Sequence, residues 1–178
     1  MLRPPDRSAL YQAIELDGKI CSEIGVFDGG NARQLLCCRP SVLYLIDTWK
    51  HEPSQPPSWA NPSDAKFEEV YLSVKQEFLK YGNVRIVRED SCKAAERFAN
   101  YWFDFVYIDT LHERDQCLRE LNTWSKKIKP GGWLCGHDYT SKYRGIIEAV
   151  TEFCAQRAVS LSALTIEEGF PSFGIQLP

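Results

Sequence analysis

Acidic and imidazole side chains stand at the carboxyl ends of several apolar runs in this sequence. The runs VLYLID, NVRIVRED and FDFVYID each end in an aspartate or an acidic pair, and GGWLCGHD ends in a histidine and an aspartate. A glutamate lies inside an earlier run, KICSEIGVF. Carboxylates accept hydrogen bonds from hydroxyl and ammonium groups, and a neutral imidazole can take a proton near neutral pH. The residues at these positions are Glu23, Asp47, Asp90, Asp109, His137 and Asp138.

The alternation of apolar runs with amphipathic segments predicts the elements that position these side chains. Helices are expected at 6–16, 31–38, 63–82, 91–101, 113–128 and 143–156, and strands at 19–27, 42–47, 83–90, 103–109, 131–138, 159–166 and 173–177. Asn31 and Ser63 are candidate N-caps of their helices. The pattern favours an α/β fold with a doubly wound, mostly parallel seven-stranded sheet and a terminal antiparallel hairpin. Such sheets bind ligands beyond the carboxyl ends of their strands, where the polar residues should converge.

The bulk composition is that of one soluble domain. The chain has 178 residues, 44% of them hydrophobic, and we expect a single domain over 1–178, with a short N-terminal helix in 1–17 and a long Pro- and Trp-rich loop at 48–62. The net charge is −3 and the basic residues are scattered, which argues against a nucleic-acid partner. No apolar run is long enough for a membrane span or a signal peptide, and the seven cysteines read as buried reduced thiols, so a cytoplasmic location is expected.

The loop after the first strand, EIGVFDGGN, points to a particular kind of ligand. It is not the dinucleotide fingerprint, because Phe27 occupies the place of the middle glycine. Glycines in this loop would let the backbone approach a ligand closely. Asp47 ends the next strand, a position suited to an acid that binds ribose hydroxyls. Since no P-loop lysine or basic cluster is present, the ligand is expected to be a nucleoside without a polyphosphate.

Taken together, these motifs resemble the class I S-adenosylmethionine-dependent methyltransferases, whose fold is Rossmann-like. The similarity rests on SEIGVFDGG, YLIDTW, Asp-Ser after the third strand, FDFVYID-x-x-H and KPGGWLCGHDY, and it covers roughly 18–177. Within that class the sequence is most similar to small bacterial proteins related to macrocin-type O-methyltransferases and cephalosporin-hydroxylase-like proteins. The resemblance implies S-adenosylmethionine as the cofactor and methyl transfer as the activity.

The resemblance also implies where the cofactor would lie. Its methionine part would contact the first loop, in which the cofactor-binding candidates are Glu23, Gly25, Phe27, Gly29 and Asn31. Asp47 would bind the ribose hydroxyls, flanked by Thr48 and Trp49. The adenine would lie near Asp90, Ser91 and Cys92, and Asp109 would border the cofactor from the fourth strand.

The same resemblance implies a metal and a base. In related metal-dependent O-methyltransferases the positions of Asp109, His137 and Asp138 bind a divalent cation, which here could be Mg²⁺, Mn²⁺ or Fe²⁺. His112 stands at the position of the base, the third residue after Asp109, so His112 and Asp109 are the catalytic candidates. Other interpretations stay open: His137 could bond a neighbouring loop, Asp138 could cap a turn, and His112 could be a surface residue.

The acceptor is the least defined part of the prediction. Trp49, His51 and Trp59 lie in the long loop, where aromatic faces suit a sugar or an aromatic acceptor and the loop could act as a lid. We expect methyl transfer to a hydroxyl of a small molecule or glycoside, with or without the assistance of a metal. The alternatives are a metal-dependent oxygenase-like enzyme and a non-catalytic S-adenosylmethionine-binding protein. Because little chain precedes the first strand, a second subunit could cover the acceptor pocket in a homo-oligomer.

Overall fold

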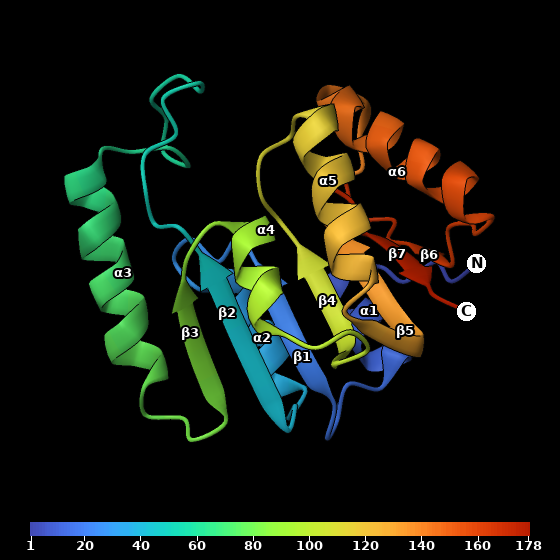
Figure 1. Cartoon of the computed structure of the whole chain (residues 1–178), viewed down its shortest axis with the longest axis horizontal. Helices are drawn as coiled ribbons and strands as arrows, with labels where there is room; N and C mark the ends of the chain where they lie inside the picture. Colours follow the sequence, from blue (N-terminus) through green and yellow to red (C-terminus); the bar gives the residue numbers. More distant parts are fainter.

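A single twisted sheet of seven strands runs through the protein in a computed structural model that describes all 178 residues (Figure 1). The strands are β1 (Ile20–Ile24), β2 (Val42–Asp47), β3 (Val84–Arg88), β4 (Phe103–Ile108), β5 (Ile128–Gly136), β6 (Ala163–Leu164) and β7 (Phe173–Gln176). They lie in the order β3-β2-β1-β4-β5-β7-β6. Only β7 runs against its neighbours, pairing antiparallel with β5 and β6. The predicted fold class and terminal hairpin are confirmed.

Helices cover both faces of this sheet, and each face has its own core. The helices are α1 (Arg7–Ile14), α2 (Gly30–Cys37), α3 (Asp64–Phe78), α4 (Ser91–Ala94), α5 (Arg114–Ser125) and α6 (Arg144–Arg157). One cluster of buried side chains joins α1, α2 and α3 to the sheet, and a second joins α4, α5 and α6 to the opposite face. In Figure 1, α4 and α5 lie in front of the sheet, while α1 and α2 lie behind it. None of the helices is both long and apolar enough to span a bilayer.

Two local predictions need correction. Asn31 is not the N-cap of α2: Gly29 holds that position with φ of 81°, and Asn31 lies in the first turn with its side chain buried. The helix predicted over 91–101 ends early, at Ala94, and a 3₁₀ turn follows over Ala95–Arg97. The chain then becomes extended at Phe98, whose ring packs 4.9 Å from Phe103. This inward aromatic contact competes successfully with continuation of the helix.

The loop at 48–62 contains no helix or strand, as predicted, yet it is internally bonded. Asn61 is 7% exposed, and its amide donates to the carbonyls of Glu52 and Gln55 at 3.0 and 3.1 Å. Its Oδ1 accepts from the Glu52 amide at 2.9 Å. Ser63 caps α3 directly after the loop, as expected, by accepting from the amide of Lys66. One buried side chain therefore holds the loop in shape beside the strand ends.

Candidate active site

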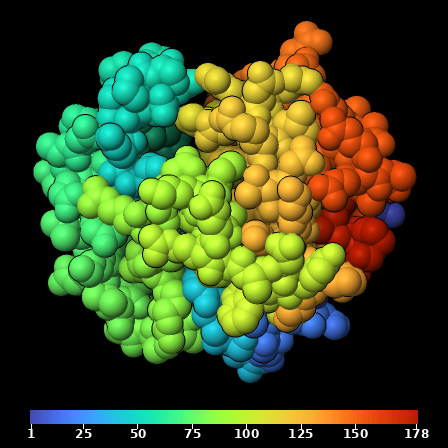
Figure 2. All heavy atoms as spheres, viewed as in Figure 1, coloured from blue at the N-terminus to red at the C-terminus, as the bar shows by residue number.

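The carboxyl ends of β1, β2, β4 and β5 are in register, which places the predicted polar residues along one edge. The amide of Gly25 donates to Ile46, that of Asp109 to Ile24, and that of His137 to Ile108, at 2.9, 2.7 and 3.1 Å. Figure 2 shows a hollow above this edge, between the loop around residues 50–60 and the segment around residues 110–115. The sheet thus brings the first loop and the acidic strand ends to a common cleft.

Asp47 fastens the first loop to the end of β2. Its Oδ2 accepts from the amides of Val26 and Phe27 at 2.8 and 2.9 Å, and its Oδ1 accepts from the Trp49 amide at 2.7 Å. A carboxylate offers about four acceptor positions. Three are used by the backbone, so Asp47 retains capacity for one further donor, such as a ribose hydroxyl. The three hydrogen bonds to Val26, Phe27 and Trp49 shape the loop.

Two of the three loop glycines, Gly25 and Gly29, make room for neighbouring protein atoms, and the expected close approach to a ligand stays a prediction. A Cβ on Gly25 would lie 1.8 Å from the carbonyl oxygen of Asp109, and the φ of Gly25 is +85°. A Cβ on Gly29, at φ +81°, would lie 2.6 Å from the ring of Phe78. Gly25 therefore permits the close approach of the β1 and β4 ends, and Gly29 permits α3 to pack on the loop.

Beneath the loop, Glu23 and Asn31 carry buried polar atoms that the protein leaves unsatisfied. Glu23 is 1% exposed, and neither its Oε2 nor the Nδ2 of Asn31 has a hydrogen-bond partner. The Oδ1 of Asn31 accepts from the Tyr11 hydroxyl at 2.8 Å. Burial raises the pKa of Glu23 well above its usual value. Unpaired buried groups are costly, and a ligand with an ammonium and a carboxylate group, such as an amino acid, would satisfy both atoms.

Trp49 and Trp59 have different surroundings, although both were aromatic candidates. Trp49 is 1% exposed, its Nε1 donates to the Phe27 carbonyl at 2.8 Å, and its ring packs 5.1 Å from Tyr71. It is a packing residue under the loop. Trp59 is 82% exposed and meets the Phe27 ring edge-on at 5.8 Å. Thr48, directly before Trp49 in the chain, is exposed, and its carbonyl accepts from Arg88.

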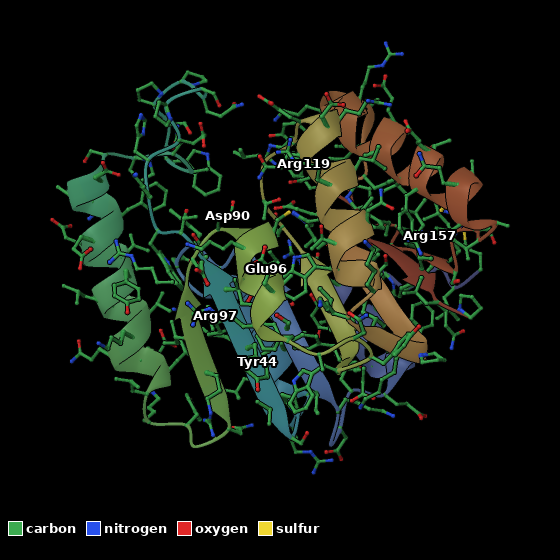
Figure 3. All side chains as sticks on the ribbon, in the orientation of Figure 1. Tyr44, Asp90, Glu96, Arg97, Arg119 and Arg157 are labelled. Carbon is green, nitrogen blue, oxygen red and sulfur yellow. The ribbon has the colours of Figure 1, made fainter.

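The residues predicted for adenine lie at the start of α4. Asp90 is exposed and caps α4 by accepting from the Lys93 amide at 3.0 Å (Figure 3). Ser91 is buried, and its hydroxyl accepts from Nε1 of Trp124 at 3.0 Å. Cys92 is half-buried beside it. Asp90 is thus both a helix cap and a group open to a ligand.

Glu120 lies behind this segment and was not predicted from the sequence. It is fully buried on α5 and accepts from the hydroxyl of Thr110. Burial raises the pKa of Glu120 to about 6, although hydrogen bonds from Thr110 and Ser91 act in the opposite direction. This side chain therefore ties α5 to the segments that follow β3 and β4.

At the ends of β4 and β5, the four remaining candidates form one polar cluster. Nε2 of His112 lies 2.7 Å from Oδ2 of Asp138. Nδ1 of His137 lies 3.2 Å from Oδ1 of Asp138 and 3.5 Å from Oδ2 of Asp109. The potential ligand atoms of Asp109, His137 and Asp138 are all within 4.8 Å of one another. A small cavity of about 10 Å³ adjoins them, enough for roughly one water.

The cluster holds its central carboxylate ionised and orients His112. Burial raises the pKa of Asp138. Hydrogen bonds from His112 and His137 lower it by more, so that it lies well below its usual range. The ring of His112 stacks on Tyr143 with centroids 3.9 Å apart, and its side chain remains 37% exposed. An Nε2–H bond to Asp138 leaves Nδ1 of His112 as the unprotonated nitrogen. That nitrogen can accept a proton from a ligand.

Arg7 completes the cluster, and it is the main residue that the sequence prediction missed. Its Nη2 lies 2.6 Å from Nε2 of His137, and its Nη1 lies 3.9 Å from Oδ2 of Asp109. The guanidinium also faces the ring of Tyr107 at 5.9 Å. A signal was present in the sequence: Arg7 precedes Leu10 and Tyr11 by three and four positions, which places it on the buried face of α1.

His137 is subject to two opposing influences. Burial and the charge of Arg7 lower the pKa of His137, whereas the hydrogen bonds and charges of Asp109 and Asp138 raise it. Arg7 acts against protonation, because a guanidinium only donates and its 2.6 Å contact requires a lone pair on Nε2. The short contact decides for a neutral imidazole, with its proton on Nδ1 facing the two aspartates.

Solved structures identify the fold as that of methyltransferases. The chain matches a SAM-dependent methyltransferase from Aquifex aeolicus with a TM-score of 0.68 and 15% identity, over 97% of this chain and 90% of that one. It matches the N-methyltransferase NodS from Bradyrhizobium japonicum WM9 with a TM-score of 0.64 and 16% identity, over 97% and 94% of the two chains. It also matches the trans-methyltransferase CalH, in complex with SAH, with a TM-score of 0.67 and 15% identity. The match covers 96% of this chain but only 55% of CalH.

Comparison of the sequence with protein-family models shows the family of the chain. The model of the methyltransferase domain family matches residues 22–139, which is more than half of the chain and includes the first loop, Asp109, His112 and His137-Asp138. The protein belongs to this methyltransferase domain family. No curated protein sequence matches the chain.

Proposed function

We propose that the protein transfers a methyl group from S-adenosylmethionine to a hydroxyl group of a small molecule or glycoside. The observation that carries this proposal is the 2.7 Å pair of His112 and Asp138, which sets an oriented imidazole at the cleft of a methyltransferase fold. Family membership supports methyl transfer, and a positioned base supports an acceptor that must lose a proton.

Residues of the first loop and the first two strands would hold the cofactor. The unsatisfied atoms of Glu23 and Asn31 suit the ammonium and carboxylate of its methionine part. Asp47 has one acceptor position left for a ribose hydroxyl, and the exposed carboxylate of Asp90 can meet the adenine amino group, with Ser91 and Cys92 at the same helix start. When bound, S-adenosylmethionine supplies a methyl group activated by a positively charged sulfur. An acidic pocket suits that charge.

The cluster at β4 and β5 would act on the acceptor. Nδ1 of His112 would take the proton of the acceptor hydroxyl when that oxygen receives the methyl group of a bound S-adenosylmethionine, which would leave as S-adenosylhomocysteine. Asp138, bonded to the other ring nitrogen, stabilises the imidazolium that results. Asp109 lies beside this pair and holds His137 and Arg7 in place. The remaining requirement is an in-line approach of the oxygen, which is a matter of positioning.

An aromatic wall beside His112 supports an acceptor with a flat face. The rings of His112 and Tyr143 are stacked, and Phe170 lies 6.0 Å from Tyr143. Phe170 is 38% exposed. Aromatic faces at the rim of a cleft bind sugar rings and planar acceptors well. The loop bearing Trp59 lies on the other side of the cleft, where Gln55 donates to Glu113 at 2.6 Å across its mouth.

The proposal is tested by transfer of a labelled methyl group to a panel of hydroxyl acceptors, including phenols, catechols and glycosides. We expect product with at least one class, its loss in His112→Ala, and retention in the control Glu96→Gln, which alters an exposed residue beyond α4. Cofactor binding without transfer to any acceptor class would favour the alternative, a non-catalytic S-adenosylmethionine-binding protein. Turnover that needs O₂ and a reductant, and no cofactor, would favour the oxygenase-like alternative.

A further inference from the structure

Arg7 reaches the polar cluster because the N-terminus is tied to the far edge of the sheet. The amide of Leu2 donates to Ser162 at 2.7 Å and that of Leu164 donates back to Leu2 at 3.1 Å, so the first residues run alongside β6. Asp6 then caps α1 by accepting from the Ala9 amide at 2.8 Å. Arg7 begins the helix, and its side chain is only 20% exposed. Its position is therefore fixed by backbone pairing and a cap.

The contact between Arg7 and His137 determines which ring nitrogen of His137 carries the proton. Nη2 of Arg7 donates to Nε2 of His137 at 2.6 Å, so Nε2 must supply its lone pair. In a neutral imidazole the proton then resides on Nδ1. Nδ1 is the nitrogen that faces Asp109 and Asp138, at 3.5 and 3.2 Å. The ring therefore donates to the two carboxylates.

A divalent cation among Asp109, His137 and Asp138 would need the opposite tautomer. Metal ligation at Nδ1 uses the lone pair of that nitrogen and leaves the proton on Nε2. An Nε2–H group would then point at the N–H of Arg7, and two donors would face each other at 2.6 Å. The guanidinium also lies 3.9 Å from Oδ2 of Asp109, where its charge would repel a metal ion. The three residues have suitable spacing for a cation but not the protonation state for one.

We propose that Arg7 is the resident cation of this cluster, and that it excludes a divalent metal from Asp109, His137 and Asp138 by fixing the Nδ1-protonated tautomer of His137. The guanidinium balances part of the charge of the two carboxylates, which is the balance a metal would otherwise supply. The metal assistance expected from the sequence does not fit the residues present. Removal of the guanidinium should then convert the cluster into a metal site.

The experiment measures Mn²⁺ binding to the metal-stripped full-length protein, from the electron paramagnetic resonance signal of free Mn²⁺. The variants are Arg7→Met, which keeps an apolar stem, and Arg3→Met, a control at an exposed arginine of the same segment. We expect Arg7→Met to bind one Mn²⁺ at least about tenfold more tightly than the wild type and Arg3→Met. The gain should vanish in Arg7→Met/Asp109→Asn. Equal affinity of wild type and Arg7→Met, whether tight or undetectable, would overturn the proposal.

A second measurement needs no variant and covers the case in which Arg7→Met fails to fold. The ¹⁵N chemical shifts of the imidazoles of the wild-type protein at pH 7.5, with His137 assigned from His137→Gln, report which nitrogen is protonated. We expect Nδ1–H and an unprotonated Nε2 for His137. An Nε2–H tautomer or a doubly protonated ring would contradict the proposal. Both tests measure metal binding or protonation directly. They can fail while the proposed methyl transfer is correct, and they can succeed while methyl transfer is absent.

Discussion

Nε2 of His112 lies 2.7 Å from Oδ2 of Asp138, although the two residues are 26 positions apart in the chain. His112 follows β4 and Asp138 follows β5, so the parallel pairing of these strands is what brings the imidazole and the carboxylate together. The carboxylate fixes the orientation of the ring and leaves Nδ1 free to take a proton. This relationship turns two strand ends into a candidate acid–base pair.

The first prediction concerns that pair. His112→Gln removes the basic nitrogen while keeping a polar side chain, and we expect kcat to fall by about 10²- to 10⁴-fold. Affinity for S-adenosylmethionine should stay within about twofold, because the contacts of His112 are with Asp138 and Tyr143, neither of which is a predicted cofactor residue. Steady-state kinetics and calorimetric titration measure the two quantities. Unchanged turnover would show that His112 is not the base.

The second prediction compares two glycines with the same sign of φ. Gly25→Ala places a Cβ 1.8 Å from the Asp109 carbonyl, whereas Gly18→Ala, at φ +71°, meets no atom within 4 Å. Gly18→Ala should lower the free energy of unfolding only by the cost of a left-handed residue, about 1–2 kcal/mol. Gly25→Ala should cost clearly more, about 3 kcal/mol or above, because two strands must separate. Urea denaturation gives both values, and similar losses for the two variants would refute the packing role of Gly25.

The third prediction concerns Asp47 as the anchor of the first loop. Asp47→Ala removes the acceptor of three backbone amides, and we expect unfolding free energy to fall by about 2–4 kcal/mol. Asp17→Ala is the matched control: its carboxylate is 62% exposed and pairs only with Arg39, so the change should be within about 1 kcal/mol. Chemical denaturation measures both. If Asp47→Ala were no more harmful than the control, the loop would have another anchor.

The fourth prediction is a pH dependence caused by Glu120. Its pKa is about 6 in the folded protein against an ordinary value of 4.5 for a glutamate, so the protonated form is favoured by folding. The stability that Glu120 contributes is therefore complete below pH 4.5 and is lost as the pH rises through about 6. Glu120→Gln cannot ionise, so its stability relative to the wild type should rise by about 2 kcal/mol between pH 4.5 and 7.5.

The measurement for Glu120 is urea denaturation of both proteins across that pH range. Glu148→Gln, at an exposed position of α6, is the control and should follow the wild type throughout. A constant difference between Glu120→Gln and the wild type would mean that Glu120 does not change its protonation there.

Much of the site could be predicted because strand ends in a parallel sheet converge. Asp109, His137 and Asp138 end neighbouring strands, and the structure does place them within one cluster. Arg7 and Glu120 are different, since each comes from a helix whose packing on the sheet is not encoded by periodicity alone. Trp49 shows the same limit: its residue type suggested a place beside the ligand, while its ring is buried under the loop. The close packing of Gly25 on Asp109 and of Gly29 on Phe78 was likewise not predicted. Local pattern thus predicts where strands end but not which distant side chains meet them.

The central claim is that this methyltransferase-family protein uses S-adenosylmethionine, and calorimetric titration of the wild-type protein with that cofactor tests it most directly. We expect 1:1 binding, together with a rise in Tm, and much weaker binding by Glu23→Gln than by the control Glu96→Gln. Absence of both binding heat and a thermal shift for the wild type would contradict it.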